Sequence, residues 1–370
     1  MTATRGLEGI VAAESSICSI VDGVLCYGGI NIDELAEHAT FEEVVYLLWH
    51  GALPKRDQLE TLKKQLGEAA AVPAEVIEGI RNYPKGIHPM AALRTAVSSL
   101  ALYDTEAQDM SPEANYRKAI RLMAQTPTLV AAFARLRKGL EPVAPKAEYT
   151  IAQNFLYMLK GEEPTETAVK ALDVALILHA DHELNASTFA ARVTVATLTD
   201  IYSGIVSAIG TLKGPLHGGA NEAVAKMLTE IGSLDNVEGY VRNKLDNKEK
   251  IMGFGHRVYK DGDPRAKWLR QMSKALTAQT GRPELYEMSV KIEDMVTGEK
   301  GLKPNVDFYS ASVYISLGLE IDLFTPIFAI SRMSGWTAHI MEQYENNRLI
   351  RPRADYTGPV GKHYVPIDQR

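Results

Sequence analysis

The sequence predicts a mainly α-helical protein of 370 residues. Apolar side chains recur at helical spacing in most of its long segments, and turns rich in glycine and proline separate these segments. Alternating patterns typical of strands are scarce. Apolar residues make up 46% of the chain and charged residues 23%, which suits a soluble globular protein with a large core. At this length we expect two domains, or one large domain with an insertion.

The first half of the chain holds most of the predicted helices. Residues 9–29 alternate weakly and favour small strands or a hairpin. The next apolar-periodic segment has an acidic start and ends before a glycine and a proline, as is typical of a helix. On similar grounds we predict helices over 34–50, 57–71, 89–103, 112–138, 148–159 and 165–182.

Residues 187–212 form the most apolar long stretch, and alanine, serine, threonine and glycine are abundant in it. Arg192 and Asp200 lie within this stretch, so we interpret it as a buried helix and not as a membrane span. Small side chains allow helices to approach closely. The stretch therefore suits a central helix or a subunit interface.

The composition of the sequence changes at Gly218, where charged residues and glycines become frequent, and the apolar pattern returns near Gly318. We therefore expect a small mobile domain over 218–318, inserted into a large helical domain made of 1–217 and 319–370. A buried helix is predicted over 324–341, and a surface tail from about Asp355.

Charge and cysteine content narrow the classes of partner and the location. A net charge of −6 and a pI of about 5.9 do not favour nucleic acid or an anionic membrane as a partner. Cys18 and Cys26 are too few for a disulfide framework, which indicates a reducing compartment. The N-terminal residues lack a basic start followed by an apolar run, so we expect no signal peptide and a cytoplasmic protein.

The segment HADHELNAS places His179 and His182 three residues apart on one helix face. His179 continues an apolar stripe and is interpreted as a core histidine. His182 lies near a turn, where a structural role and a ligand contact both stay open. A metal site is not favoured, because the spacing differs from H-E-x-x-H and no third ligand is indicated.

The segment GPLHGGANE follows a helix-breaking Gly-Pro and precedes a helix predicted from Ala220. His217 is therefore expected just before a helix N-terminus, where the helix dipole disfavours the imidazolium and lowers the histidine pKa. A neutral imidazole there can donate a hydrogen bond to a carbonyl oxygen that is becoming enolate-like. Capping of the turn is the structural alternative.

The segment MGFGHRVYKDGDPRA places His256 among glycines and basic residues. Gly253 and Gly255 let the backbone approach a ligand closely. Together with Arg265, His256 suits a ligand that carries phosphate or carboxylate groups. Two further basic residues, taken singly, fit a solvated loop: Arg257 and Lys260.

Four more charged residues lie in apolar or exposed contexts. Asp307 lies among apolar and aromatic residues, where desolvation would raise the pKa of its carboxyl and make it a better base. The alternative is that Asp307 caps a helix that begins near Phe308. Arg332 lies in an apolar helix and, if buried, needs an anionic partner. Arg351 and Arg353 lie in an exposed-looking segment, and ordinary salt bridges are the alternative for each arginine.

Taken together, GPLHGGAN, GFGHRVY, DPR and PNVDFYS resemble, in order and spacing, the signatures of citrate synthase in its short bacterial form. The resemblance extends over nearly the whole chain. It implies an almost all-α fold with a large helical domain, a smaller mobile domain and a two-fold dimer. The implied activity is the condensation of acetyl-CoA with oxaloacetate and water to give citrate and CoA. The alternative is a 2-methylcitrate synthase, which takes propionyl-CoA.

The resemblance also implies a role for each motif residue. Asp307 is the base, His217 stabilises the enolate, and His256 is the acid on the oxaloacetate carbonyl. The residues implied to bind oxaloacetate are His182, His256, Arg265, Arg332 and Arg351, the last of them from the other subunit. The residues implied to contact coenzyme A are Met252, Gly253, Phe254 and Gly255. Because the thioester is a substrate, we expect no cofactor and no metal.

Two functions of other classes stay open from the residues alone. A metal-dependent hydrolase would use the histidines of the three motifs as ligands, namely His179, His182, His217 and His256. A helical scaffold without catalysis is the other possibility, although a scaffold has no need of histidines bracketed by glycines.

Overall fold

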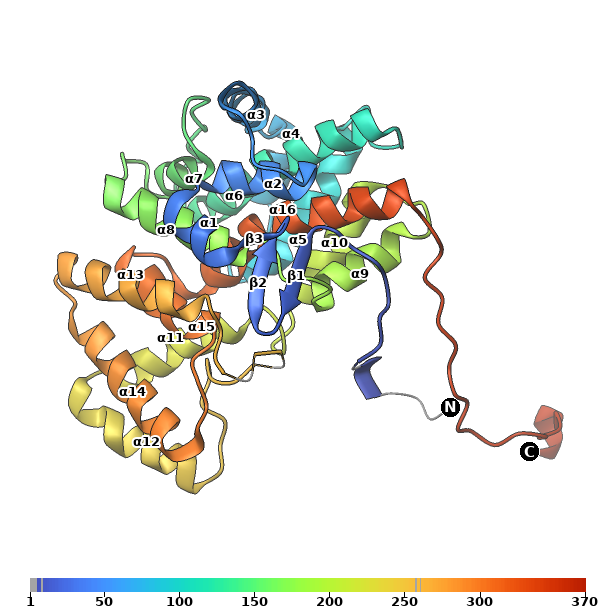
Figure 1. Cartoon of the computed structure of the whole chain (residues 1–370). Coiled ribbons are helices and arrows are strands. Elements are labelled where there is room, and N and C mark those ends of the chain that lie inside the picture. The colour runs from blue at the N-terminus through green and yellow to red at the C-terminus, as the bar shows by residue number, and fades with distance from the viewer. Residues whose placement is uncertain (1–4, 8, 257, 260) are drawn as a thin grey trace.

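The structure is a computed structural model that describes residues 5–7, 9–256, 258–259 and 261–370. Over these residues it is mainly helical, as predicted, with one small sheet (Figure 1). The helices of the first half are α1 (Ile32–His38), α2 (Phe41–His50), α3 (Arg56–Ala69), α4 (Ala74–Arg81), α5 (Pro89–Tyr103), α6 (Pro112–Leu136), α7 (Ile151–Lys160) and α8 (Glu166–His179). Those of the second half are α9 (Ala186–Val195), α10 (Ile201–Leu212), α11 (Ala220–Ile231), α12 (Val237–Asp246), α13 (Ala266–Gln279), α14 (Glu284–Lys300), α15 (Val306–Ser316) and α16 (Phe324–Glu345).

The predicted hairpin near the N-terminus is present. Strands β1 (Cys18–Val21) and β2 (Val24–Tyr27) pair antiparallel, and the short β3 (Ile30–Asn31) extends the sheet in the order β1-β2-β3. The turn between β1 and β2 uses Asp22 and Gly23, both with positive φ, as a two-residue hairpin turn requires. Cys18 and Cys26 lie in this sheet, and both thiols are free.

The prediction of one helix over 34–50 is wrong, because two helices, α1 and α2, occupy this region. The chain is extended at Ala39 and Thr40, and Thr40 caps α2. The Thr40 side chain accepts the N–H of Glu43, while the Glu43 carboxylate accepts the N–H of Thr40 at 2.7 Å. This capping box restarts the helix even though the apolar spacing runs through the break.

The prediction of one helix over 187–212 is also wrong, because α9 and α10 share it and pack against each other. The break lies at Leu198, whose φ of 64° is left-handed, and Asp200 then caps α10 through the N–H of Ser203. Helix α4 was not predicted at all. Close packing of small residues, the other expectation for this region, is met at Gly204, where an added Cβ would lie 2.5 Å from Val195.

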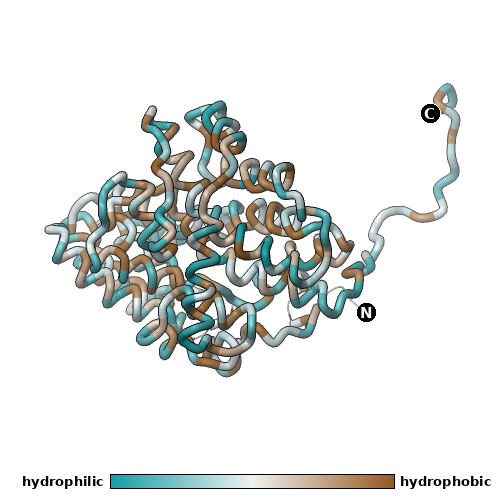
Figure 2. The backbone as a smooth tube through the Cα atoms, turned by 90° about the horizontal axis from the view of Figure 1, so that it is seen from above, coloured by the Kyte–Doolittle hydropathy of each residue, from teal (hydrophilic) through white to brown (hydrophobic). Residues whose placement is uncertain are grey.

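Helix α16 forms the centre of the larger group of helices in Figure 1 and contacts α2, α5, α6, α8, α9 and α10. Every residue from Phe324 to Ile340 is buried, including Arg332 and His339. The predicted buried helix over 324–341 is therefore confirmed. Viewed from above, Figure 2 shows apolar stretches recurring along the helices of the body.

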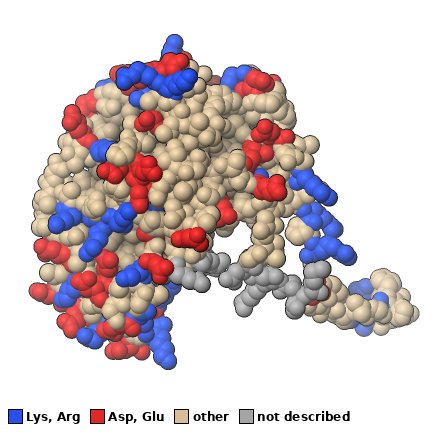
Figure 3. Space-filling view, in the orientation of Figure 1, with Lys and Arg blue, Asp and Glu red and all other residues tan. Residues whose placement is uncertain are grey.

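Helices α11 to α15 form a second group, at the lower left of Figure 1. Helix α15 lies against α11 and α13, and α12 lies against α14. The group meets the rest of the molecule where α13 and α15 contact α8 and where α11 contacts α16. Acidic and basic side chains mix closely over this part of the surface (Figure 3). The division into domains at residues 218–318 stays a prediction.

After α16 the chain leaves the body as an exposed C-terminal segment (Figures 1 and 2), which confirms the predicted surface tail. Among the described residues, no helix has both the length and the apolar character needed to cross a membrane.

The capping box of α2 can be tested by Thr40→Ala. We expect a loss of about 1 kcal/mol in the free energy of unfolding, because the N–H of Glu43 loses its side-chain acceptor. Urea unfolding followed by circular dichroism measures this loss. Thr61→Ala is the matched control, since the Thr61 hydroxyl only bonds a carbonyl within α3 on an exposed face. Equal stabilities of the two variants would contradict the capping role.

Candidate active site

His182 lies in the turn between α8 and α9, three residues beyond the end of α8, so the helix predicted over 165–182 ends earlier than expected. Its side chain is buried, and its Nε2 lies 3.0 Å from the hydroxyl of Tyr259. The imidazole of His256 is 5.2 Å away, centroid to centroid, in an edge-on arrangement. Burial, together with the charges of Arg265 and Arg332, lowers the pKa of His182 well below its usual value. The turn thus presents a neutral imidazole beside His256.

His217 lies two residues before Gly219, the N-cap of α11, as the sequence predicted. Its Nε2 faces two groups of Ser187, the backbone N–H at 3.3 Å and the hydroxyl at 2.8 Å. Because an N–H can only donate, Nε2 is the acceptor and the proton of the neutral ring lies on Nδ1. Trp336 donates to the same Ser187 hydroxyl at 3.1 Å and holds it in place.

The pKa of His217 is lowered to about 4, in the predicted direction. We predicted the helix dipole as the cause, but the main causes are burial and then the positive charge of Arg332. The ring therefore stays neutral at pH 7 with a donor on Nδ1. Gly218 permits this placement, because an added Cβ would lie 2.6 Å from the carbonyl oxygen of Leu212.

The loop of residues 252–256 lies along the segment that leads into α15. Gly255 donates to the carbonyl of Lys303, and Asn305 donates to the carbonyl of Gly253, both at 2.9 Å. Gly253 has a φ of 85°, and an added Cβ would lie 2.8 Å from Phe308. Only glycine combines this backbone with this contact. The pairing places the segment that ends at His256 beside the segment that leads into Asp307.

Hydrogen bonds from the backbone fix which nitrogen of His256 carries the ring proton. Its Nδ1 accepts the backbone N–H groups of Val258 at 3.0 Å and Tyr259 at 3.3 Å, so the proton of the neutral ring lies on Nε2. Burial and the charge of Arg265 lower the pKa of His256. A hydrogen-bond donor is therefore available on the other side of the ring.

Asp307 lies in the first turn of α15, and the alternative in which it caps the helix is wrong. Asn305 is the cap, and its side chain accepts the N–H of Asp307 at 3.1 Å. The Asp307 residue is partly exposed, but its Oδ1 is buried and has no hydrogen-bond partner among the described residues. Desolvation raises the pKa of this carboxyl to about 7, against the opposing charge of Arg265. The carboxyl has the character of a base, as predicted from its context.

Arg265 is buried and paired. Its Nε and Nη2 donate to the two oxygens of Asp263 at 2.9 and 2.8 Å. Asp263 also accepts the N–H of Val306 at 3.0 Å. The pair therefore connects the DPR motif to the start of α15, beside Asp307.

Arg332 is 1% exposed, and the described part of the chain does not supply the ionic partner that we predicted for a buried arginine. Among the described residues no carboxylate lies within ion-pair distance of it. Its Nε donates to the carbonyl of His179 at 2.8 Å, its Cζ lies 4.7 Å from the centre of the Phe328 ring, and its Nη1 has no hydrogen-bond partner in the described part of the chain. After burial, the charge of Arg332 contributes to the lowered pKa values of His182 and His217, and it opposes the rise in the pKa of Asp307, so these four groups share one electrostatic neighbourhood.

Arg351 does not join this cluster within one chain. Arg351 and Arg353 are both exposed, and the C-terminal segment that carries them leaves the body after α16 (Figure 1). Two other predicted residues lie outside the described part of the chain: Arg257 and Lys260.

The four predicted coenzyme A contacts belong to the loop described above. Gly253 and Phe254 are buried, whereas Met252 and Gly255 are partly exposed. A cavity of about 240 Å³ opens beside the end of this loop. Its lining residues are Gly255, His256, Tyr259, Gly262, Asp263, Gly301, Leu302, Lys303 and Pro304.

The structure adds three residues that sequence reasoning did not select. Asp263 pairs with Arg265, Tyr259 bonds His182, and Ser187 fixes the tautomer of His217. All three residues lie within predicted motifs, so their polar groups were a usable signal. The contact of Ser187, the last residue of HADHELNAS, with His217 spans 30 residues and was not indicated by either motif.

His179 is a core histidine, as predicted. Its Nδ1 donates to the carbonyl of Ala175 at 2.8 Å, and burial lowers its pKa to about 3. The part of the chain that the structure describes holds no group of three or more metal-ligating side chains. The hydrolase alternative built on four histidines therefore finds no support in this geometry.

The sequence matches the family model described as "Citrate synthase, C-terminal domain" over residues 6–353. A protein named citrate synthase 2 from Bacillus subtilis (strain 168) is 68% identical over 371 residues, covering 100% of each chain. This chain belongs to the citrate synthase family. The family predicted from the four motifs is confirmed, and the scaffold alternative is wrong.

Other citrate synthase family members match along the same length. The 2-methylcitrate synthase of Shewanella oneidensis is 41% identical and covers 99% of this chain and 97% of its own. A solved structure is described as the ternary complex of carboxymethyl coenzyme A and oxaloacetate with citrate synthase from Thermoplasma acidophilum. It superposes with a TM-score of 0.93 and 36% identity, covering 99% of both chains. The predicted fold class is therefore confirmed at the level of the whole chain.

The raised pKa of Asp307 makes stability depend on pH. Between its usual pKa near 3.8 and about 7, the folded protein holds a proton that the unfolded chain releases, so stability from this group falls as pH rises. We expect Asp307→Asn to match the wild type at pH 4 and to exceed it by about 4 kcal/mol at pH 8, at 1.36 kcal/mol per unit.

Urea unfolding of the ligand-free proteins from pH 4 to pH 8 measures this difference. Asp294→Asn is the matched control, because the Asp294 side chain is exposed on α14. Parallel pH curves for the wild type and Asp307→Asn would show that Asp307 titrates as an ordinary carboxyl.

Proposed function

We propose that this chain catalyses the condensation of acetyl-CoA with oxaloacetate and water to give citrate and CoA. The observation that carries the proposal is Asp307, a carboxyl with a buried, unpartnered oxygen and a pKa of about 7, in one electrostatic neighbourhood with neutral histidines. Membership of the citrate synthase family supports the same reaction.

The first step is removal of a proton from the methyl group of acetyl-CoA. Asp307 takes the proton, and negative charge develops on the thioester oxygen. His217 stabilises that oxygen through its Nδ1–H, which is free because Ser187 occupies Nε2. Removal of a comparable donor in other enzymes costs about 3 kcal/mol of transition-state stabilisation. A neutral imidazole suits this role because its pKa is lowered to about 4.

The second step forms the carbon–carbon bond. The enolate carbon attacks the ketone carbon of oxaloacetate, and the ketone oxygen takes a proton from Nε2 of His256. The tautomer of His256 is set for this donation, because two backbone N–H groups occupy its Nδ1. The product is a citryl thioester, and water then hydrolyses its carbon–sulfur bond to release CoA and citrate.

The carboxylates of oxaloacetate supply the anion that Arg332 lacks. A buried guanidinium without an ionic partner is costly, and a bound dicarboxylate removes this cost. Arg265 and His182 lie in the same neighbourhood, so together with Arg332 they orient the substrate and fix the face of the ketone. Residues 252–255 contact the coenzyme A portion.

Closure of a small domain over 218–318 excludes water before condensation, since premature hydrolysis would waste the thioester. The active form is a two-fold dimer in which Arg351 enters the site of the other subunit. The exposed position of Arg351 supports this arrangement.

The reaction needs no cofactor or metal, because side chains supply the base and both donors. We place the protein in the cytoplasm, which suits its free thiols.

A thiol-release assay tests the proposal. We expect CoA to be released when oxaloacetate is supplied with acetyl-CoA, and more slowly with propionyl-CoA. A preference for propionyl-CoA would make the chain a 2-methylcitrate synthase instead.

Asp307→Ala should lower turnover about a hundredfold or more, as loss of a general base does. The Asp294→Asn control should retain wild-type turnover, and near-normal turnover of Asp307→Ala would refute the assignment of the base.

Co-expression of two inactive variants tests the shared site. In a mixed dimer of Asp307→Ala and Arg351→Ala subunits, one site receives both intact residues if Arg351 acts across the interface. Random assembly then restores about a quarter of wild-type activity, because about half of the dimers are mixed and each has one good site. If Arg351 acts within its own chain, the mixture stays inactive.

A further inference from the structure

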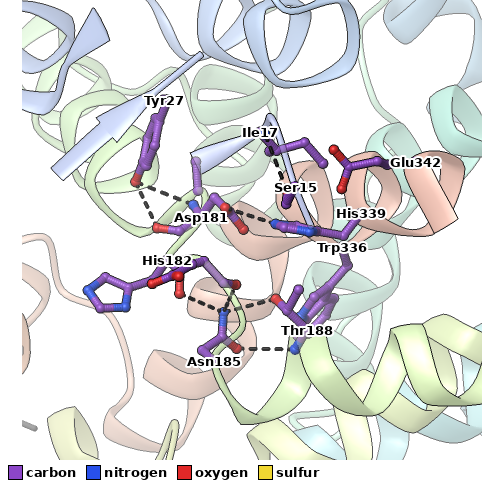
Figure 4. Close-up of polar contacts among 12 residues, drawn as sticks. Ser15, Ile17, Tyr27, Asp181, His182, Asn185, Thr188, Trp336, His339 and Glu342 are labelled. Atoms are coloured by element: carbon purple, nitrogen blue, oxygen red, sulfur yellow. Dashed lines mark hydrogen bonds and ion pairs between the residues drawn. The ribbon is translucent and has the colours of Figure 1, made fainter. Parts of the chain in front are cut away.

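Asp181 is a buried carboxylate that the proposed reaction does not use. It directly precedes His182 and is 0% exposed. Its Oδ2 lies 3.1 Å from Nε2 of His339, a residue of α16 that is also 0% exposed, and its Oδ1 has no partner among the described residues. Figure 4 shows the His339 ring directed at the Asp181 carboxylate.

The contacts of His339 define its protonation. Nη1 of Arg192 lies 3.1 Å from Nδ1 of His339, and a guanidinium can only donate. Nδ1 is therefore an acceptor, and the single ring proton lies on Nε2, from where it is donated to Asp181. Arg192 is held in turn by Glu342 at 2.6 Å and by Gln343 at 2.9 Å. His339 is thus a neutral bridge between a fixed cation and the Asp181 carboxylate.

The backbone of the same turn is held from two sides. The hydroxyl of Tyr27 lies 3.0 Å from the carbonyl of Asp181 and accepts its N–H at 3.3 Å (Figure 4). On the other side, Gly335 of α16 lies so close that an added Cβ would be 2.4 Å from Oδ1 of Asp181 and 2.5 Å from the carbonyl of Ala180. Polar contacts and close packing therefore leave the turn before His182 little freedom.

The arrangement also links Asp181 to Arg332. Arg332, Gly335 and His339 follow one another along α16, spaced so that they share one face of the helix. Burial lowers the pKa of Arg332, and the negative charge of Asp181 is the main opposing influence. The negative charge of Asp181 therefore stabilises the buried guanidinium of Arg332.

We propose that His339 and Asp181 are positioning residues for the oxaloacetate site, holding the turn that carries His182. The inference rests on the proposed function, since it concerns how a keto dicarboxylate is bound. Neither residue touches substrate in this proposal. His339 acts through Asp181, and Asp181 acts through the turn that carries His182.

Three variants test the proposal in the steady-state assay. We expect His339→Leu to raise the KM for oxaloacetate about tenfold or more, because displacement of a substrate-orienting group is costly, while the KM for acetyl-CoA changes by less than about threefold. His339→Gln should stay within about threefold of the wild type for both substrates. Its amide can donate to Asp181 and accept from Arg192, as the imidazole does.

Thr337→Val is the matched control for loss of a buried polar group on α16. The Thr337 hydroxyl accepts from Trp49 at 2.9 Å, away from Asp181. This variant should unfold at a lower temperature and yet keep the wild-type KM for oxaloacetate. If His339→Leu gives no folded protein, His339→Asn replaces it, because the shorter amide cannot reach both partners and should show the same rise in KM.

Two results would overturn the inference. One is a wild-type KM for oxaloacetate in His339→Leu, and the other is a His339→Gln variant as impaired as His339→Leu. Failure of the wild-type protein to release CoA from acetyl-CoA and oxaloacetate would instead refute the proposed function. The two failures are therefore distinguishable in one set of assays.

Discussion

The structure depends on one electrostatic constraint, the burial of Arg332 without an ionic partner among the described residues. Water cannot solvate this guanidinium, and protein groups satisfy only part of it, through the carbonyl of His179 and the face of Phe328. Such a group is stable only because the surrounding fold leaves it no alternative position. Helix α16, buried over its first seventeen residues and packed against helices of both groups, supplies that rigidity. Burial and, after it, the charge of Arg332 keep the imidazoles of His182 and His217 neutral.

The tautomers of His217 and His256 depend on a second constraint: the protein donates a hydrogen bond to one nitrogen of each ring. Ser187 occupies Nε2 of His217, and the backbone after His256 occupies its Nδ1. In each case the free nitrogen must carry the proton, so a donor is directed away from the fold. Tautomers are set here by donors that cannot reverse their role. Burial then removes the competing imidazolium form.

Much of the fold and of the site could be predicted from sequence, and the failures have physical causes. Gly253 and Gly255 were predicted to let the backbone approach a ligand closely; an added Cβ at Gly253 would clash with Phe308, whereas one at Gly255 would meet only an ordinary contact. Apolar periodicity predicted continuous helices at 34–50 and 187–212, because caps at Thr40 and Asp200 interrupt the helix without interrupting the spacing. Contacts between distant residues, such as Ser187 with His217, depend on tertiary packing that no local pattern encodes.

The exposed C-terminal segment has a consequence for biogenesis. On the proposed arrangement, a newly synthesised polypeptide can complete its helices and core but lacks one guanidinium at each pocket until it meets a second copy. Maturation is then a bimolecular event, and its half-time lengthens as the concentration of chains falls. Removal of this segment by a protease would leave the rest of the protein folded but would abolish its activity.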